Sequence, residues 1–189
     1  MPQREDYQLR HIEEGDLTRV LEWRNSKRIR QFMFSDHIIT MKEHMDWFKK
    51  IKQEKNTICK IFEYKGRPIG LVNIYQIDRR NKKCFWGFYL GEENLPHGTG
   101  TIMGFLALEY IFFQLQMRKL CGEVFAFNQA SLNYFNKLGF IREGYFKKHV
   151  KKNRKYEDVI FFSLFKKDWV KIRKKLEKIC FGSKEPCGK

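Results

Sequence analysis

Apolar runs and runs in which apolar and polar residues alternate occur along most of the chain, and both are typical of β-strands. Many of their residues are aromatic or β-branched, which favours strands further. Turn residues such as those of Lys65-Gly66-Arg67-Pro68 separate the runs. The pattern predicts seven strands, over Tyr7 to Ile12, Thr57 to Tyr64, Ile69 to Ile77, Cys84 to Leu90, Leu120 to Phe127, Ile141 to Lys151 and Tyr156 to Phe165.

Other stretches carry apolar residues every three or four positions, which predicts helices. Residues able to cap a helix precede three of these stretches, and Thr40 with Glu43 has the spacing of a capping box. We expect helices over Leu17 to Arg24 with Asp16 as cap, Met41 to Ile51, Thr101 to Gln116, Gln129 to Leu138 with Asn128 as cap and Gly139 as stop, and Lys167 to Ile179. Residues 24–39, mixed basic and aromatic, are expected to form a loop with functional potential.

The order of these elements predicts the fold class. Three consecutive strands read as an antiparallel meander, and a strand-helix-strand crossover follows them. We therefore expect an α/β (α+β) fold, with a mixed, mostly antiparallel sheet of about seven strands and helices on both faces. A chain of 189 residues suits one domain, expected over residues 1–181 with a flexible tail over 182–189.

The formal net charge of +16 means that the protein attracts anions. Nucleic acid, ribosomes, membrane surfaces and small polyphosphate ligands all fit that charge. The densest basic run, Lys147 to Lys155, lies between two predicted strands, which indicates a hairpin turn rather than a disordered arm. Five cysteines, an odd number, favour free thiols in a reducing compartment. The first residues contain no apolar signal segment and no run approaches a membrane span, so we expect a cytoplasmic protein.

The segment from Lys83 to Gln116 joins a predicted strand to an apolar helix through Gly98-Thr99-Gly100-Thr101. A glycine-containing turn at a helix N-terminus leaves backbone N–H groups unpaired, with the positive end of the helix dipole behind them. Such a turn can bind a phosphate or pyrophosphate. The alternative is that the two glycines only make a tight turn.

Residues 128–140, with Asn128, Lys137 and the pair Gly139-Phe140, resemble the N-x-x-[A/S]-x-x-x-x-x-K-x-G-F helix of the GNAT superfamily of acetyl-CoA-dependent N-acetyltransferases. The order of the predicted elements is similar to that family over nearly the whole chain. Tyr156-Glu157-Asp158-Val159 and Asp168-Trp169 resemble its branch of ribosomal-protein N-terminal acetyltransferases. Leu21 to Asn25, Gln31 to Ser35 and Met41 to Phe48 are similar instead to the branch that acetylates UDP-4-amino-4,6-dideoxy-N-acetyl-altrosamine in pseudaminic acid synthesis.

The resemblance implies that acetyl-CoA is the co-substrate, with no metal. The pantetheine arm of acetyl-CoA would enter between the strands Cys84 to Leu90 and Leu120 to Phe127, which should splay apart. The arm would bond to the backbone of Tyr89 and Leu90, and a backbone N–H in the gap would stabilise the oxyanion. The implied cofactor-binding residues are Tyr89, Leu90, His97, Gly98, Thr99, Gly100, Thr101, Asn128, Phe135 and Lys137.

Acetyl transfer requires a base for the amine, and the resemblance places a glutamate facing the substrate at Glu123. A plain pairing of Glu123 with one of the many lysines is the alternative. The superfamily's usual acid, a tyrosine, is replaced by Phe135 here. Tyr134 and Ser131 are candidate acids, and expulsion of a thiolate without a protein acid is a third option.

The resemblance implies that Arg24 and His44 bind the nucleotide part of the acceptor substrate. An arginine suits a diphosphate, because it can form two parallel hydrogen bonds. Met33, Phe34, Trp47 and Phe85 match the apolar wall for the methyl group of a 6-deoxy sugar. Each could instead be a surface or core residue. A UDP-amino sugar is thus the expected partner; membranes and nucleic acid are not expected, and a homodimer is a possible assembly.

Three functions are compatible with these features of the sequence. The first is acetylation of the 4-amino group of a UDP-linked amino sugar, by direct transfer. The second is N-terminal acetylation of a protein such as a ribosomal protein, although a basic target would be repelled by a basic enzyme. The third is non-catalytic binding of nucleic acid or a ribosome on the same scaffold.

Overall fold

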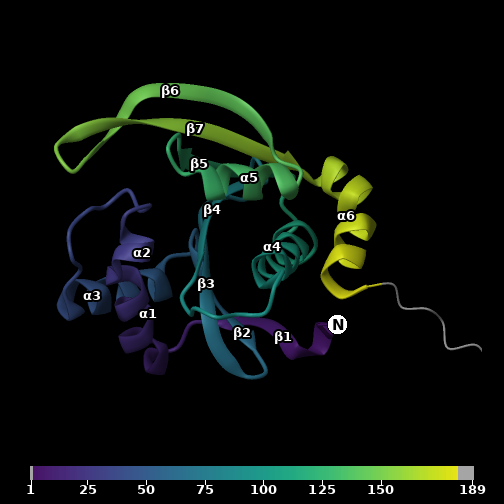
Figure 1. Ribbon diagram of the computed structural model, residues 1–189, viewed down its shortest axis with the longest axis horizontal. Helices are drawn as coiled ribbons and strands as arrows, with labels where there is room; N and C mark the ends of the chain where they lie inside the picture. Colours follow the sequence, from purple (N-terminus) through teal and green to yellow (C-terminus); the bar gives the residue numbers. More distant parts are fainter. Residues whose placement is uncertain (1, 183–189) are drawn as a thin grey trace, which may run out of the picture.

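The computed structural model describes residues 2–182 and contains one seven-stranded sheet in the order β1-β2-β3-β4-β5-β7-β6 (Figure 1). The β4–β5 pair is parallel and all the other pairs are antiparallel. The predicted fold class is confirmed. The strands are β1 Tyr7–His11, β2 Ile58–Tyr64, β3 Arg67–Asp78, β4 Lys83–Leu90, β5 Lys119–Phe125, β6 Ile141–Lys152 and β7 Lys155–Phe165.

Helices cover both faces of the sheet, as Figure 1 shows. The front face, as we name it, carries α1 Leu17–Asn25, α2 Lys27–Arg30 and α3 Met41–Gln53. The back face carries α4 Thr99–Glu109, which continues as a π-helical turn Tyr110–Gln114, together with α5 Gln129–Lys137 and α6 Lys166–Phe181. Short 3-10 turns at Arg4–Asp6 and Glu14–Asp16 flank β1. Each face buries its own apolar cluster, and Trp86 and Phe135 belong to the back cluster.

Strands β4 and β5 separate soon after they meet. Their pairing covers only residues 83–85 of β4 and 119–121 of β5, so the pairs after Phe85 and Cys121 are open. The expected splay is therefore present. Because the backbone groups beyond this fork lack a partner strand on one side, they can bond to a bound molecule.

Two local predictions were wrong. Asp16 does not cap α1 with its side chain. Its carboxylate instead accepts from both terminal nitrogens of Arg10, at 2.6 and 2.7 Å, and from the Glu13 backbone N–H at 2.9 Å. The segment 24–39 is not a continuous loop, because residues 27–30 form α2 and bury Ile29.

Other helix and turn signals are confirmed. Thr40 and Glu43 form the capping box of α3, and the Asn128 side chain accepts from the Ser131 N–H at the start of α5. Gly139 ends that helix with φ of 84°, and the β6–β7 turn places Asn153 and Arg154 at φ of 48° and 68°. These left-handed conformations suit glycine and asparagine, while Arg154 adopts one at some cost.

The four cysteines within the described residues are free and buried. The same part of the chain has no helix long and apolar enough to cross a bilayer, and no cluster of three or more potential metal ligands. The predicted tail lies outside the described residues except for residue 182, and the single-domain assignment stays a prediction.

Candidate active site

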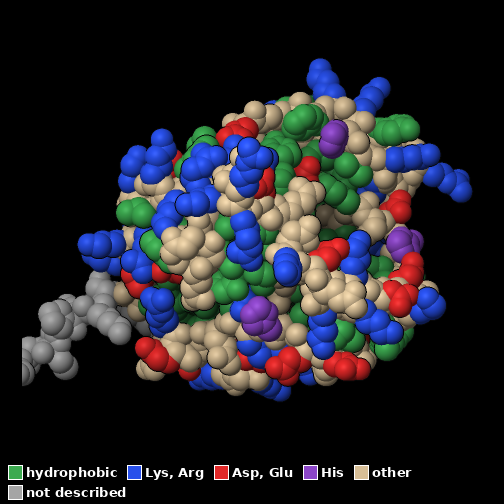
Figure 2. All heavy atoms as spheres, turned by 180° about the vertical axis from the view of Figure 1, so that it is seen from behind, with side chains coloured by type: hydrophobic (Ala, Val, Ile, Leu, Met, Phe, Trp, Pro, Cys, Tyr) green, Lys and Arg blue, Asp and Glu red, His purple; other side chains and the backbone are tan. Residues whose placement is uncertain are grey.

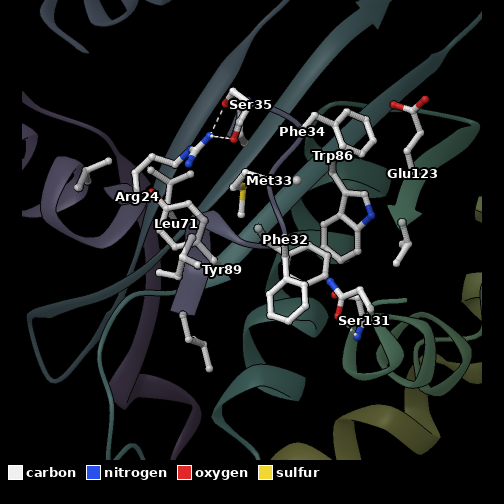
Figure 3. Close-up of a pocket in the computed structure, with 18 of the residues that line it drawn as sticks. Arg24, Phe32, Met33, Phe34, Ser35, Leu71, Trp86, Tyr89, Glu123 and Ser131 are labelled. Carbon is white, nitrogen blue, oxygen red and sulfur yellow. Dashed lines mark hydrogen bonds between the residues drawn. The ribbon is translucent and has the colours of Figure 1, made fainter. Parts of the chain in front are cut away.

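A cavity of about 890 Å³ lies at the fork between β4 and β5 (Figure 3). Its lining includes residues of the front face, such as Arg24 and Trp47, and residues of the back face, such as Met103 and Tyr134. The cavity can reach both faces because the two strands no longer pair beyond the fork. It therefore offers one space in which molecules from the two sides of the sheet can meet.

Most of the predicted site residues line this cavity, including all three catalytic candidates. They are Glu123, Tyr134, Ser131, Tyr89, Leu90, Gly100, Asn128, Phe135, Arg24, Met33, Phe34, His44 and Trp47. Six predicted residues do not line it, and they are His97, Gly98, Thr99, Thr101, Lys137 and Phe85.

The glycine turn stands at the back-face side of the cavity. Gly98 has φ of 87° and precedes the first residue of α4, so the turn uses glycine's conformational freedom. The amides of Gly100 and Thr101 lie in the first helical turn, where no intrahelical acceptor exists. Lys137 donates to the Thr101 hydroxyl at 2.8 Å, which brings a positive charge to the same turn.

Two of the six lie elsewhere. His97 lines a separate cavity of about 530 Å³ beside Tyr7, Tyr64 and Lys65. Phe85 lies on the front face, stacked on Tyr75 at 5.8 Å and edge-on to Phe161 at 5.5 Å. A molecule in the main cavity would contact Phe85 only if it extended past the residues that line the cavity.

Glu123 on β5 lines the cavity, and Figure 3 shows it on the side away from Arg24. Burial raises the pKa of its carboxyl group, while the nearby His149 acts in the opposite direction. No ion pair joins Glu123 to a lysine in residues 2–182. A half-buried carboxylate with a raised pKa and no ionic partner is suited to accept a proton.

The front end of the cavity contains a half-buried guanidinium group. Arg24 donates from Nη2 to the Ser35 hydroxyl and, at 3.5 Å, to the Ser35 carbonyl oxygen, whereas its buried Nη1 has no partner (Figure 3). Burial lowers the Arg24 pKa and the nearby Arg30 lowers it further, while Tyr89 acts in the opposite direction. Its net electrostatic environment therefore favours the arrival of a negative charge.

His44 on α3 is also buried, and its Nε2 has no hydrogen-bond partner. The ring stacks on Trp47 with centroids 5.0 Å apart. Burial lowers the His44 pKa, so the neutral imidazole is favoured. A neutral ring nitrogen facing a cavity can donate or accept one hydrogen bond.

The tip of the β6–β7 hairpin holds the front wall of the cavity in place. Lys152 is 4% exposed and donates from Nζ to the Met33 carbonyl oxygen at 2.6 Å and to that of Arg30 at 3.3 Å. The backbone N–H of Asn153 donates to Asp36 at 2.8 Å. These bonds fix residues 30–36 beside the cavity, and Figure 1 shows the hairpin reaching over this region.

Comparison with known proteins decides the family. The family model described as an acetyltransferase (GNAT) domain matches residues 7–141. The chain belongs to the GNAT acetyltransferase family. It is therefore an enzyme that transfers an acetyl group from acetyl-CoA to an amine.

Individual relatives of this acetyltransferase differ in their acceptors. Spermidine N(1)-acetyltransferase of Escherichia coli K12 is 24% identical over 170 residues, covering 90% of this chain and 91% of the relative. Acetyltransferase PseH of Campylobacter jejuni is 28% identical over 121 residues, covering 64% of this chain and 74% of the relative. The structure of spermidine N-acetyltransferase from Vibrio cholerae with CoA and spermine superposes with a TM-score of 0.82 at 20% identity, over 88% of this chain and 99% of that one.

Phe135 and the two candidate acids, Tyr134 and Ser131, lie differently in the acetyltransferase. Phe135 is 2% exposed and packs among Trp86, Phe140 and Phe162. Tyr134 turns the other way and donates its hydroxyl to the Gly100 carbonyl oxygen at 2.6 Å, and burial raises its pKa. Ser131 lines the cavity, and within residues 2–182 its hydroxyl group makes no hydrogen bond. Its backbone N–H donates to the side-chain oxygen of Asn128.

We expect Ser131→Ala to lower kcat more than Tyr134→Phe does. Loss of a hydroxyl that bonds to a developing thiolate should lower kcat by about tenfold. Removal of the Tyr134 hydroxyl breaks a bond to a backbone carbonyl and should lower the free energy of unfolding by about 1 kcal/mol. Steady-state kinetics and chemical denaturation of both variants measure these effects. The reverse order of the two kcat values would restore Tyr134 as the candidate acid.

Several polar groups in the cavity were not predicted from the sequence. Asn73 on β3 lines it, and its side-chain oxygen is buried without a partner. The available signal was the amide of Asn73 between apolar neighbours in the strand Ile69 to Ile77. Trp86 also lines the cavity with an unpartnered indole nitrogen, and Lys152 contacts the wall from far along the chain.

Proposed function

We propose that this acetyltransferase acetylates the 4-amino group of a UDP-linked 4-amino-4,6-dideoxy sugar, as in pseudaminic acid synthesis. The observation that carries the proposal is the Arg24 guanidinium, which is half-buried in the cavity and has an unpartnered nitrogen. A phosphate or diphosphate of the acceptor can bind there with charge-assisted hydrogen bonds. The resemblance of Leu21 to Asn25, Gln31 to Ser35 and Met41 to Phe48 to the pseudaminic acid branch supports the same class of acceptor.

Neighbouring charges strengthen the case for an anionic acceptor. Arg30 has a buried Nε without a partner. Burial lowers the Lys152 pKa, the nearby Arg24 and Arg30 lower it further, and Asp36 and Glu157 oppose the shift. The carboxylate of Glu43, which also lines the cavity, is engaged with Thr40 and His37. Three cationic side chains, Arg24, Arg30 and Lys152, therefore lie close together beside this end of the cavity.

The uncharged parts of the acceptor have suitable partners as well. His44 Nε2 and Asn73 Oδ1 are buried and unpartnered, so they can bond to neutral polar groups such as those of a nucleobase or an N-acetyl group. Met33, Phe34 and Trp47 provide apolar surface in the same cavity. A 6-deoxy sugar exposes a methyl group that can pack on such a surface.

The other co-substrate is proposed to occupy the fork and the glycine turn. Acetyl-CoA supplies an acetyl thioester together with a pyrophosphate. The open backbone of Tyr89 and Leu90 can bond to its arm, and the amides of Gly100 and Thr101 with Lys137 can bind its phosphates.

The chemistry then divides between the two strands of the fork. Glu123 on β5 accepts the proton of the amine, and a backbone N–H of β4 stabilises the negative charge on the acyl oxygen. The transfer is direct and needs no covalent enzyme intermediate. Ser131 is placed to donate to the sulfur from α5.

A polyamine acceptor is the second candidate, because the spermidine acetyltransferase of Escherichia coli aligns with 90% of this chain. Its cationic substrate would meet Arg24 at the front of the cavity, with Arg30 close behind it, which costs electrostatic free energy. A basic protein N-terminus meets the same difficulty. Figure 2 shows Lys and Arg side chains scattered among acidic ones on the face opposite to Figure 1, without the continuous basic stripe expected of nucleic-acid binding.

A thermal-shift panel tests the proposal. The ligands are acetyl-CoA, UDP, UDP-GlcNAc, spermidine and an RNA oligomer, each measured alone and, except the first, with CoA. A ligand at a hundred times its Kd adds about 2.7 kcal/mol to the free energy of unfolding. We expect acetyl-CoA and UDP each to raise Tm. Stabilisation by spermidine without UDP would replace the proposal with the polyamine function, and stabilisation by RNA alone would refute both.

A further inference from the structure

Trp86 lies at the fork itself, in the first β4 position beyond the paired residues. Its ring is 2% exposed and is fixed between aromatic neighbours, stacked on Phe140 at 5.6 Å and tilted against Phe88 at 4.5 Å. Across the fork stands Gly122, where an added Cβ would be 3.3 Å from the indole nitrogen. Figure 3 shows this nitrogen turned toward the strand that carries Glu123. The indole is therefore held rigidly with its N–H pointing into the opening between the strands.

The indole N–H has no acceptor, although it is buried and lines the cavity. Two other tryptophans of the chain show the usual solution, since Trp23 donates to Glu92 and Trp169 donates to Glu109, both at 3.1 Å. An unpaired buried donor is unfavourable, because it has lost its hydrogen bonds to water and gained none in return. When an unpaired donor lines a cavity, a bound ligand is expected to supply the acceptor atom.

We propose that the Trp86 indole N–H donates a hydrogen bond to the thioester sulfur of acetyl-CoA and stabilises the thiolate as it leaves. The inference rests on the proposed position of the thioester in the fork, and it does not depend on the identity of the acceptor. It adds a residue to the chemistry that the sequence did not indicate.

The two faces of the sheet explain why the sulfur is the acceptor atom. Successive residues of β5 face opposite sides, so Glu123 faces the front while Gly122, next to Phe135, faces the back. The amine approaches from the side of its base, Glu123. The leaving group then departs toward the back, where the Trp86 nitrogen lies. No donor hydroxyl exists at Phe135, which packs on the same ring with centroids 5.9 Å apart.

The proton and electron balance of the step is simple. The amine nitrogen forms a bond to the acyl carbon, the carbon–sulfur bond breaks, and sulfur keeps the electron pair. The proton released by the amine goes to Glu123. The indole keeps its own proton throughout, because indole is far too weak an acid to transfer it, and it contributes a hydrogen bond alone.

Proton–nitrogen NMR of the indole groups in the full chain tests the contact directly. We expect the Trp86 N–H signal, assigned by its loss in Trp86→Phe, to move downfield with CoA and with acetyl-CoA. Desulfo-CoA, which lacks the sulfur, should not produce that shift, and the Trp169 signal should stay in place with all three ligands. Equal shifts with CoA and desulfo-CoA, or no shift with either, would overturn the proposal.

Kinetics and stability provide the second readout, with Trp169→Phe as matched control. Trp86→Phe removes an N–H that has no partner in the free protein, whereas Trp169→Phe breaks a hydrogen bond. We expect kcat with the UDP-linked 4-amino sugar to fall by about 10–100-fold in Trp86→Phe. In Trp169→Phe, Tm should fall and kcat should stay within twofold. An unchanged kcat in Trp86→Phe contradicts the inference.

A more conservative replacement separates the N–H from the packing of the ring. Benzothienylalanine at position 86 keeps the bicyclic shape and replaces the N–H by sulfur, so it should match Trp86→Phe in kcat and wild type in Tm. Recovery of wild-type kcat with this residue would show that only packing matters and would refute the hydrogen bond. If wild type fails to acetylate the amino sugar, the proposed acceptor is wrong, and the NMR result still decides the role of Trp86.

Discussion

Replacing Glu123 by glutamine is expected to lower kcat by about 10²–10⁴-fold, the usual range for loss of a general base. The amide keeps the size of the side chain and cannot accept the proton of the amine. Binding of acetyl-CoA should be unchanged, because no cofactor contact is assigned to Glu123. Steady-state kinetics gives the first quantity, and the shift of Tm by acetyl-CoA gives the second.

A pH profile and a control variant make this prediction specific. Burial raises the Glu123 pKa, and the base works only when deprotonated, so kcat/KM of wild type should rise as pH increases through that raised pKa. This limb should vanish in Glu123→Gln. Glu143→Gln removes the same charge from an ion pair with Lys119 and should leave turnover within twofold. Wild-type turnover in Glu123→Gln would remove Glu123 from the mechanism.

Arg24→Ala is expected to raise KM for the UDP-linked amino sugar by about 10–100-fold, the effect of losing a charge-assisted hydrogen bond of roughly 1.5–3 kcal/mol. The stabilisation by UDP should decrease in parallel, while that by acetyl-CoA should persist. Arg19→Ala is the matched control, since Arg19 lies on the same helix and is exposed. An unaltered KM in Arg24→Ala would exclude its role in binding the nucleotide. An Arg24→Ala enzyme that gains activity on spermidine would indicate that this charge selects against polyamines.

Local signals in the sequence predicted the fold well. The capping box of Thr40 and Glu43, the cap at Asn128 and the turn at Asn153 each depend on residues within four positions, and the structure contains all of them. Asp16 shows where a local signal fails. Its carboxylate finds a better partner in Arg10, six residues earlier on the neighbouring strand, so a bidentate ion pair replaces the helix cap.

The site was predictable only in part, for reasons of geometry. The fork followed from the order of the elements, but the directions of side chains did not. Tyr134 and Phe135 are neighbours on α5 and point about 100° apart, which places one on a backbone carbonyl and the other in the core. Asn73 and Trp86 occupy ordinary strand positions, and only the missing hydrogen-bond partners distinguish them.

The bond from Lys152 to the Met33 carbonyl joins residues 119 positions apart. During synthesis on the ribosome, Met33 therefore emerges long before the lysine that will hold it. A nascent chain that ends before β6 lacks the contact that fixes the wall beside Arg24. The enzyme should therefore become able to select an acceptor late in translation, after the β6–β7 hairpin has left the ribosome and folded against residues 30–36.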